Sequence, residues 1–446
     1  MKSRSWLNLF VLILTFFMTS APGALQAQEQ DVYTLKQGIE EALEKNLFLK
    51  AVREKTEEAR HVESQARADF LPKLGTSYGY TRLSEVSRSR AVLMGGGLEI
   101  PAYDMNTQDN YQWKATLTQP LFTGFALTSV HELAKLGVDL SEADHQLARL
   151  DLILAVKEAY FNILKAEKRE DVADKAVEFL QSNAGVAQSF YREGMIPIND
   201  LLKAEVELAN ALQELVKAQN GVALAGAAFN TLLVRPVNEP VEVEDILTYR
   251  PERAVYEEYL QKALERRPEI LAVDINLLQA DQQIRLARSA FYPEAGLRYD
   301  YIKEGDDPGV SGSPFHDANH WQVTVGLDWT FFEWGKTRSA VREKRSIKRQ
   351  IMDTKAALED QIGLEIKQAI LDLDVADRNI PTTEKAMEQA EENLRVSRQR
   401  YRAQVTTMTE VLDAQTLLTQ ARTNYYNALY DHNLAKARLR RALGED

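Results

Sequence analysis

Cysteine is absent from the chain, and its apolar runs are short. Without thiols the protein can form no disulfide, no thiolate metal site and no acylated cysteine anchor. The apolar run at residues 9–18 is shorter than the roughly 20 residues of a membrane-spanning helix, and no run of that length follows. Basic residues are outnumbered, giving a net charge of −12, which argues against nucleic acid as a partner. Packing alone must hold the fold.

The first 27 residues have the organisation of a signal peptide. Lys2 and Arg4 precede the apolar run, and small residues then lead to Ala27. This order is typical of secretory signals. A membrane-anchoring helix is the alternative, which the short run disfavours. We expect cleavage to leave Gln28 as the first mature residue.

The mature chain contains an internal duplication. Residues 42–46 match residues 263–267 at a separation of 221, whereas Tyr191 matches Tyr401 at a separation of 210. The separation changes because the copies differ in length at one place, between residues 72 and 117. Insertions concentrate in surface loops, so we expect a loop there. We predict a first structural repeat at residues 28–235, a linker at 236–253 and a second structural repeat at 254–446.

Both copies have the same predicted order of elements. Each begins with a helical stretch that ends at the proline of a Phe-Xaa-Pro motif, because proline stops a helix. Two strands follow, then a very long helix, a turn and another helix. A helix of about 65 residues is on the order of 100 Å long. The helical stretches are 34–70, 126–190 and 198–233, and in the second copy 254–291, 336–401 and 408–443.

The predicted strands alternate between apolar and polar residues. In residues 321–331 the residues at odd positions are apolar and those at even positions are polar or glycine, and residues 111–118 follow a similar pattern. Strands of about 10 residues with one apolar face suit a transmembrane β-barrel. The alternative is a soluble, half-buried sheet, which has the same period. Four strands cannot close a barrel and lipid tolerates no open edge, so a membrane location requires several chains.

The last helix of each copy carries a heptad seam in which a large residue alternates with alanine. Such a seam imposes left-handed supercoiling, and its alanines allow a close approach between helices. A second row flanks the seam at Val206, Ala209, Val216 and Ala223, so this helix can join a wall. A simple antiparallel coiled-coil hairpin is the alternative. The seam runs through residues 201, 204, 208, 211, 215, 218, 222, 225 and 229, and again 210 residues later.

These features together resemble the outer membrane efflux protein family over essentially the whole mature chain. The resemblance is carried by the duplicated elements, the Phe-Xaa-Pro motifs, Arg267-Pro268-Glu269, and tips with a Tyr-turn-Asp-Leu order. It implies an α+β membrane protein with four transmembrane β-strands per protomer. Three protomers would make a 12-stranded β-barrel, and their long coiled-coil helices would form a periplasmic α-barrel.

The resemblance also implies the function of an exit duct in a tripartite efflux or type I secretion system. Its expected partners are two further copies in a homotrimer, a periplasmic adaptor (membrane fusion) protein, an inner-membrane transporter and outer-membrane lipid, with no nucleic acid. The expected location is the outer membrane of a Gram-negative bacterium. The alternative from another class is a soluble periplasmic coiled-coil scaffold protein.

The family's narrow periplasmic entrance corresponds to the hairpin tips. Glu410 and Asp413 match its paired carboxylates and lie i and i+3 on one helical face. Three copies would place six carboxylates around the mouth and raise the local cation concentration. The alternative is a solvated helix start, where acidic residues are favourable in any helix.

Three further residues match the family's latch at this entrance. Tyr401 and Asp200 correspond to the pair whose hydrogen bond helps to hold the entrance closed, and Asn199 corresponds to a second latch position. The arginine partner of that position is replaced here by Thr406. The second tip also has Gln404 where glycine is common. We expect a latch with fewer charge-assisted bonds to open more easily.

No residue pattern in the chain predicts an enzyme. His316 and His320 are the only close histidines, and no helix aligns them for a metal. No arrangement of nucleophile, base and orienting group is visible. We expect no catalysis, no cofactor and no bound metal.

Overall fold

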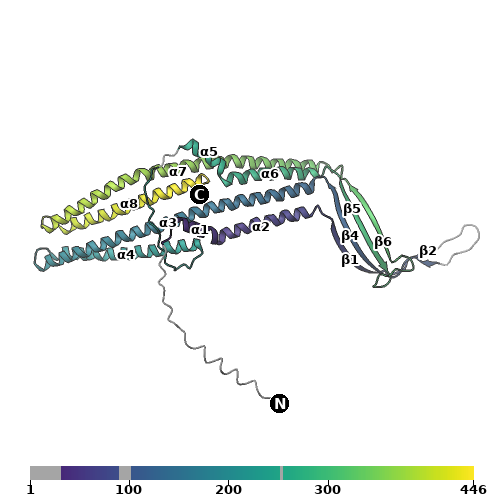
Figure 1. Ribbon diagram of the computed structural model, residues 1–446, viewed down its shortest axis with the longest axis horizontal. Helices are drawn as coiled ribbons and strands as arrows, with labels where there is room; N and C mark the ends of the chain where they lie inside the picture. Colours follow the sequence, from purple (N-terminus) through teal and green to yellow (C-terminus); the bar gives the residue numbers. More distant parts are fainter. Residues whose placement is uncertain (1–31, 90–101, 252–254) are drawn as a thin grey trace, which may run out of the picture.

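The computed structural model describes residues 32–89, 102–251 and 255–446, so the predicted signal peptide lies outside the described part. A layer of long helices carries a four-stranded sheet at one end and two hairpin tips at the other (Figure 1). The helices are α1 (Leu35–Lys45), α2 (Leu47–Ala68), α3 (Ala126–Arg192), α4 (Ile198–Leu233), α5 (Tyr256–Arg266), α6 (Pro268–Ser289), α7 (Lys336–Arg402) and α8 (Met408–Ala442). The strands are β1 (Lys73–Arg82), β2 (Arg88–Ser89), β3 (Tyr103–Asp104), β4 (Asp109–Thr123), β5 (Glu294–Gly305) and β6 (Asn319–Asp328).

The first helical stretch of each copy is broken in two, which the sequence analysis did not predict. In the first copy Asn46 separates α1 from α2, and its side chain accepts a hydrogen bond from the Leu49 backbone N–H at 3.1 Å. In the second copy Arg267 separates α5 from α6, and Pro268 occupies the first helical position. A side-chain cap and a proline at the first position both favour a helix start. The predicted single helices were therefore wrong at these two corners.

The large sheet is antiparallel, with the strand order β1-β4-β5-β6. On β6 the apolar side chains Trp321, Val323, Val325 and Leu327 are exposed on one face. On the other face Asp300 of β5 accepts hydrogen bonds from Thr116 and Gln322. The alternation is confirmed, although β6 ends at Asp328 and not at residue 331.

In the described part of the chain, no helix combines the length and the apolar character that a membrane span requires.

The long helices form two antiparallel hairpins, α3 with α4 and α7 with α8, which lie beside each other through α3 and α8. Most of the α8 seam residues are buried, including His432. On α4 the seam positions Leu201, Ala204, Ala218 and Phe229 are buried. The heptad seams are therefore the buried faces of the hairpins.

The linker between the copies crosses the middle of the helical layer (Figure 1). The Tyr33 backbone N–H donates to the Glu242 carbonyl oxygen at 2.8 Å, and the Glu244 N–H donates to that of Tyr33 at 3.0 Å. The buried Tyr160 hydroxyl of α3 lies 2.9 Å from the Tyr33 carbonyl oxygen and 2.8 Å from that of Glu244. These bonds attach the linker to α3.

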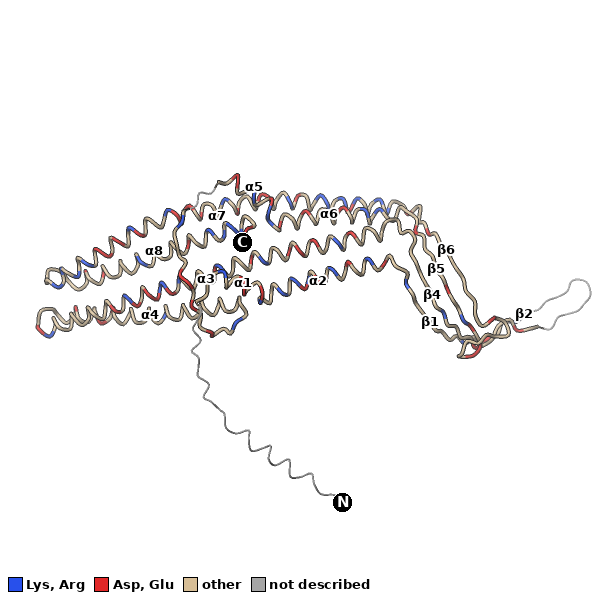
Figure 2. Tube along the Cα trace, viewed as in Figure 1, with Lys and Arg blue, Asp and Glu red and all other residues tan. Residues whose placement is uncertain are grey.

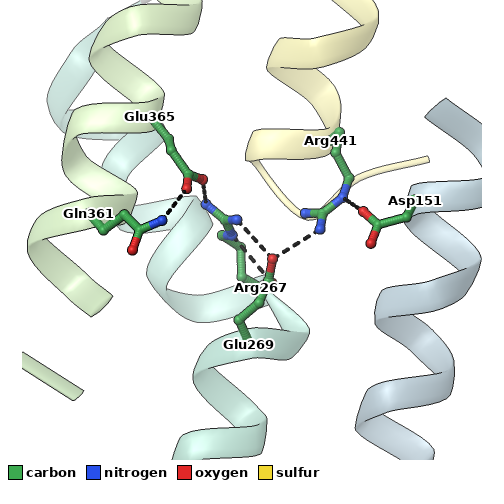
Figure 3. A network of polar contacts seen from close by, with 6 residues as sticks. All are labelled: Asp151, Arg267, Glu269, Gln361, Glu365 and Arg441. Carbon is green, nitrogen blue, oxygen red and sulfur yellow. Dashed lines mark hydrogen bonds and ion pairs between the residues drawn. The ribbon is translucent and has the colours of Figure 1, made fainter. Parts of the chain in front are cut away.

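An ion-pair network holds the second corner against three long helices (Figure 3). The buried Arg267 guanidinium donates to Glu269 at 2.8 Å and to Glu365 of α7 at 2.6 Å. Arg441 of α8 donates to Glu269 at 3.0 Å and to Asp151 of α3 at 2.6 Å. The motif Arg267-Pro268-Glu269 thus joins the second copy internally and connects it to the first.

Candidate functional site

The two hairpin tips have the same backbone turn. The chain takes a left-handed conformation at Gly194 (φ 73°) and at Gln404 (φ 61°). The Met195 N–H donates to the Phe190 carbonyl oxygen at 2.8 Å, and the Val405 N–H to that of Arg400 at 3.0 Å. These bonds satisfy carbonyl groups that are otherwise unpaired at a helix end. Glycine adopts this left-handed conformation without steric cost. At Gln404 the side chain makes the same conformation cost about 1 kcal/mol.

An apolar core lies immediately behind the tips. Leu201, Tyr401, Met408 and Val411 are buried together where the ends of α3, α4, α7 and α8 meet. The ring of Phe190 lies 5.8 Å from that of Tyr401, measured between centroids. The core fixes the position of one tip relative to the other, because each tip contributes residues to it.

The structure brings Tyr401 and Asp200 near each other, but it contains no hydrogen bond between them. The Tyr401 side chain is buried, and among the described residues its hydroxyl has no hydrogen-bond partner. Burial and then the negative charge of Asp200 raise the pKa of Tyr401. A buried, unpaired hydroxyl costs free energy. The predicted bond between these two residues stays a prediction.

The two carboxylates of the second tip have different surroundings. Glu410 accepts a hydrogen bond from Arg400 at 2.7 Å and another from Thr406. Asp413 is exposed and has no side-chain partner in the described part of the chain. Glu410 is therefore paired within its own hairpin, whereas Asp413 has no paired positive charge among the described residues.

Polar contacts also connect one tip to the other. Lys203 donates to the Thr409 hydroxyl at 3.2 Å, and the Gln404 amide lies 3.0 Å from the Met195 sulfur. Asn199 is exposed at the start of α4 and makes none of these contacts. The polar contacts between the tips thus come from residues other than the predicted latch.

Sequence reasoning missed Arg400, the arginine that partners Glu410. The signal was present, since Arg400 precedes the turn by about as many residues as Glu410 follows it. Within the ranges that the structure describes, no group of three or more acidic or histidine side chains is placed to hold a metal ion. The arrangement at the tips is one of charge and packing.

Comparison with known proteins gives a consistent result. A family model described as "Outer membrane efflux protein" matches residues 38–233 and 259–445. The chain is 23% identical to the outer membrane protein TolC of Vibrio cholerae serotype O1, over 97% of this chain and 95% of that protein. It is 21% identical to Escherichia coli TolC, over 85% and 76%. A solved structure of CusC has a TM-score of 0.77 at 18% identity and covers 97% of this chain and 96% of that one.

Proposed function

The chain belongs to the outer membrane efflux protein family, and we propose that three copies of it close one continuous exit duct. It is an outer-membrane channel protein with helices that extend into the periplasm. The family is one of transport proteins, which supports this function over that of a soluble scaffold. The duct is passive, and an inner-membrane transporter supplies the energy.

Open edges support assembly from several copies. Strands β1 and β6 each pair on one side only in the four-stranded sheet. Unpaired backbone N–H and C=O groups are very costly in lipid, so the edges must be joined. Pairing β6 of one copy with β1 of the next would close a cylinder, and three copies would give the expected 12 strands.

An exposed apolar row on α4 supports the same assembly in the periplasm. Val206, Val216 and Leu224 are between about half and three quarters exposed, with Val206 at 57% and Leu224 at 73%. Among the helices that the structure describes, none covers these side chains, because α4 packs through its seam. A neighbouring copy would cover this row and complete the helical wall.

We assign the periplasmic entrance to the tips, with Glu410 and Asp413 as the charged ring. Asp200, Tyr401 and Asn199 would form the latch between neighbouring hairpins. The unpaired hydroxyl of Tyr401 supports this role, since a donor without an internal partner is free for another bond. A periplasmic adaptor protein and an inner-membrane transporter would dock at this end. We also infer that residues 28–235 and 254–446 are the two repeats.

The absence of native cysteine makes cross-linking a clean test of the assembly. One cysteine on β1 and one on β6 should yield a covalent trimer under oxidation in membranes. Pairs placed on β4 and β5 of the same sheet are the matched control, and they should cross-link within one chain. Cross-linked products no larger than a dimer, or recovery of the chain as a water-soluble monomer, would contradict the proposal.

The latch is tested by single-channel conductance in planar lipid bilayers. Asp200→Ala should increase the conductance, because it removes an acceptor at the entrance. Asp174→Ala changes an exposed carboxylate farther along the same hairpin and should leave the conductance unchanged. Unchanged conductance in D200A would show that Asp200 does not hold the entrance closed.

A further inference from the structure

A row of four arginines lies on α7 next to the sheet. Residues 336–349 contain seven basic residues and one acidic residue, and they form the end of α7 that adjoins the strands (Figure 2). Arg338, Arg342, Arg345 and Arg349 are spaced at helical intervals and all are exposed. Among the described residues, none of the four side chains has a hydrogen bond or an ion pair. Within the described ranges their charges are therefore unpaired.

The internal duplication shows that the scaffold does not require these charges. At the same positions of α3, 210 residues earlier, the residues are Thr128, Glu132, Lys135 and Asp139. The first copy thus builds the same helix with one basic and two acidic residues. Basic residues in the first turn of a helix are also unfavourable with its dipole, and the first turn of α7 has no acidic residue.

The arginines do not face the helices that pack beside α7. Each arginine comes one residue after a position that lies on the face toward α6. Arg342 follows the buried Val341, and Arg349 follows Lys348, which pairs with Asp281 of α6 at 2.7 Å. One residue corresponds to about 100° around a helix. Gly363 lies two heptads beyond Arg349, on the same face, and there the Tyr256 hydroxyl of α5 approaches closely. The arginines therefore lie on the surface that α5 covers farther along.

Aromatic side chains mark the level of a membrane surface just before this row. Trp334 is 91% exposed and Phe331 is 80% exposed, and both lie between the end of β6 and the start of α7. Aromatic residues gather at the headgroup level at both ends of transmembrane strands. Side chains of a helix tilt toward its N-terminus, which for α7 is the end at the sheet. Arg338 and Arg342 thus extend toward that level.

We propose that this row, the arginine stripe, binds the phosphate groups of anionic phospholipids in the periplasmic leaflet of the outer membrane. The proposal rests on the membrane placement given under Proposed function. Arginine suits phosphate because its planar guanidinium donates two parallel hydrogen bonds. The stripe extends for about 16 Å along the helix. Because screening acts over about 8 Å, Arg338 should contribute most and Arg349 least.

The test measures lipid selectivity in the reconstituted full-length protein. Spin-labelled phosphatidylglycerol and spin-labelled phosphatidylcholine are compared for association with the protein in phosphatidylcholine vesicles. We expect a preference for phosphatidylglycerol that R338Q weakens about fivefold at this site and R349Q less than about twofold. The variant with all four arginines replaced by glutamine should lose the preference. Lys135→Gln, at the position of α3 that corresponds to Arg345, is the matched control and should retain it.

Several outcomes would overturn the proposal. They are no preference in the wild-type protein, an unchanged preference in the fourfold variant, and equal losses in R338Q and R349Q, because an effect of the membrane surface should weaken along the stripe. Displacement of the lipid by millimolar inorganic phosphate would indicate a site for free anions. Single-channel conductance is measured on the same vesicles, and all variants should match the wild type. Failure of the wild type itself to insert would instead contradict the proposed function.

Discussion

The two copies turn the same corner with different chemistry. Asn46 in the first copy is a neutral cap, and its amide donates to the Leu232 carbonyl oxygen at the end of α4 at 3.0 Å. Arg267, at the matching position, is 6% exposed and forms ion pairs with Glu269 and Glu365. The same backbone break is thus held in one copy by hydrogen bonds of an amide and in the other by the ion pairs of a buried arginine. The comparison shows that duplication preserved the backbone while the side chains that stabilise it diverged.

Removing the side chain at each corner should reveal the largest difference in stability between the two copies. Arg267→Ala leaves Glu269 and Glu365 without their shared partner and should cost about 3–5 kcal/mol of unfolding free energy. Asn46→Ala removes a cap and should cost about 1 kcal/mol. Denaturant unfolding in detergent measures both. Equal losses would mean that the ion pairs add nothing beyond capping.

The second corner should also depend on pH. Burial alone would raise the pKa of Glu269, but hydrogen bonds from Arg267 and its own backbone N–H, with the charge of Arg441, lower it to about 2 from the ordinary 4.5. A carboxylate with a lowered pKa stabilises the fold above about pH 4.5 and loses that effect as the pH falls toward 2. The loss should be about 3 kcal/mol.

Unfolding free energy measured between pH 6 and pH 2 checks this dependence. Glu269→Gln should remove most of the decrease in unfolding free energy at low pH. Asn46→Ala should leave the slope of unfolding free energy against pH as it is in the wild type. A wild-type slope retained in E269Q would place the acid sensitivity elsewhere in the molecule.

The two tips provide the next comparison, because the same left-handed turn has glycine in one and glutamine in the other. Gly194→Ala should destabilise by about 1 kcal/mol, since it adds a side chain at φ 73°. Gln404→Gly should stabilise by a similar or smaller amount, because it relieves strain but loses the contact with Met195. Thermal unfolding of the two variants shows whether each is less or more stable than the wild type. A destabilised Q404G would show that the contact outweighs the strain.

The two carboxylates of the second tip should differ in function more than in stability. Arg400→Ala breaks an exposed ion pair and should cost less than about 1 kcal/mol. Asp413→Asn should reduce the cation preference of the channel more than Glu410→Gln does, because Arg400 already offsets Glu410. Reversal potentials under a salt gradient measure the preference. A larger effect of E410Q would reverse the assignment of the charged ring.

Much of the fold could be predicted because its signals are local in sequence. The heptad positions from Leu201 to Phe229 predicted the buried face of α4, and alternation in residues 321–328 predicted the two faces of β6. The corners were missed because a break of one residue hardly disturbs a helical period. At the candidate site, the turn and the position of Glu410 at a helix start followed from the sequence. Its partner Arg400 was missed, although its spacing from the turn was a signal.

The sequence by itself determined the duplication, the order of the elements and the faces on which they pack, because periodicity and turn residues act over a few neighbours. Only the tertiary structure decided which distant side chains meet. Arg441 finds Asp151 from 290 positions away, and Arg267 finds Glu365 from 98. Among the residues that the structure describes, the arginine stripe of α7 is left without a partner. Such contacts depend on how each helix is rotated and aligned against its neighbours, which no local pattern specifies.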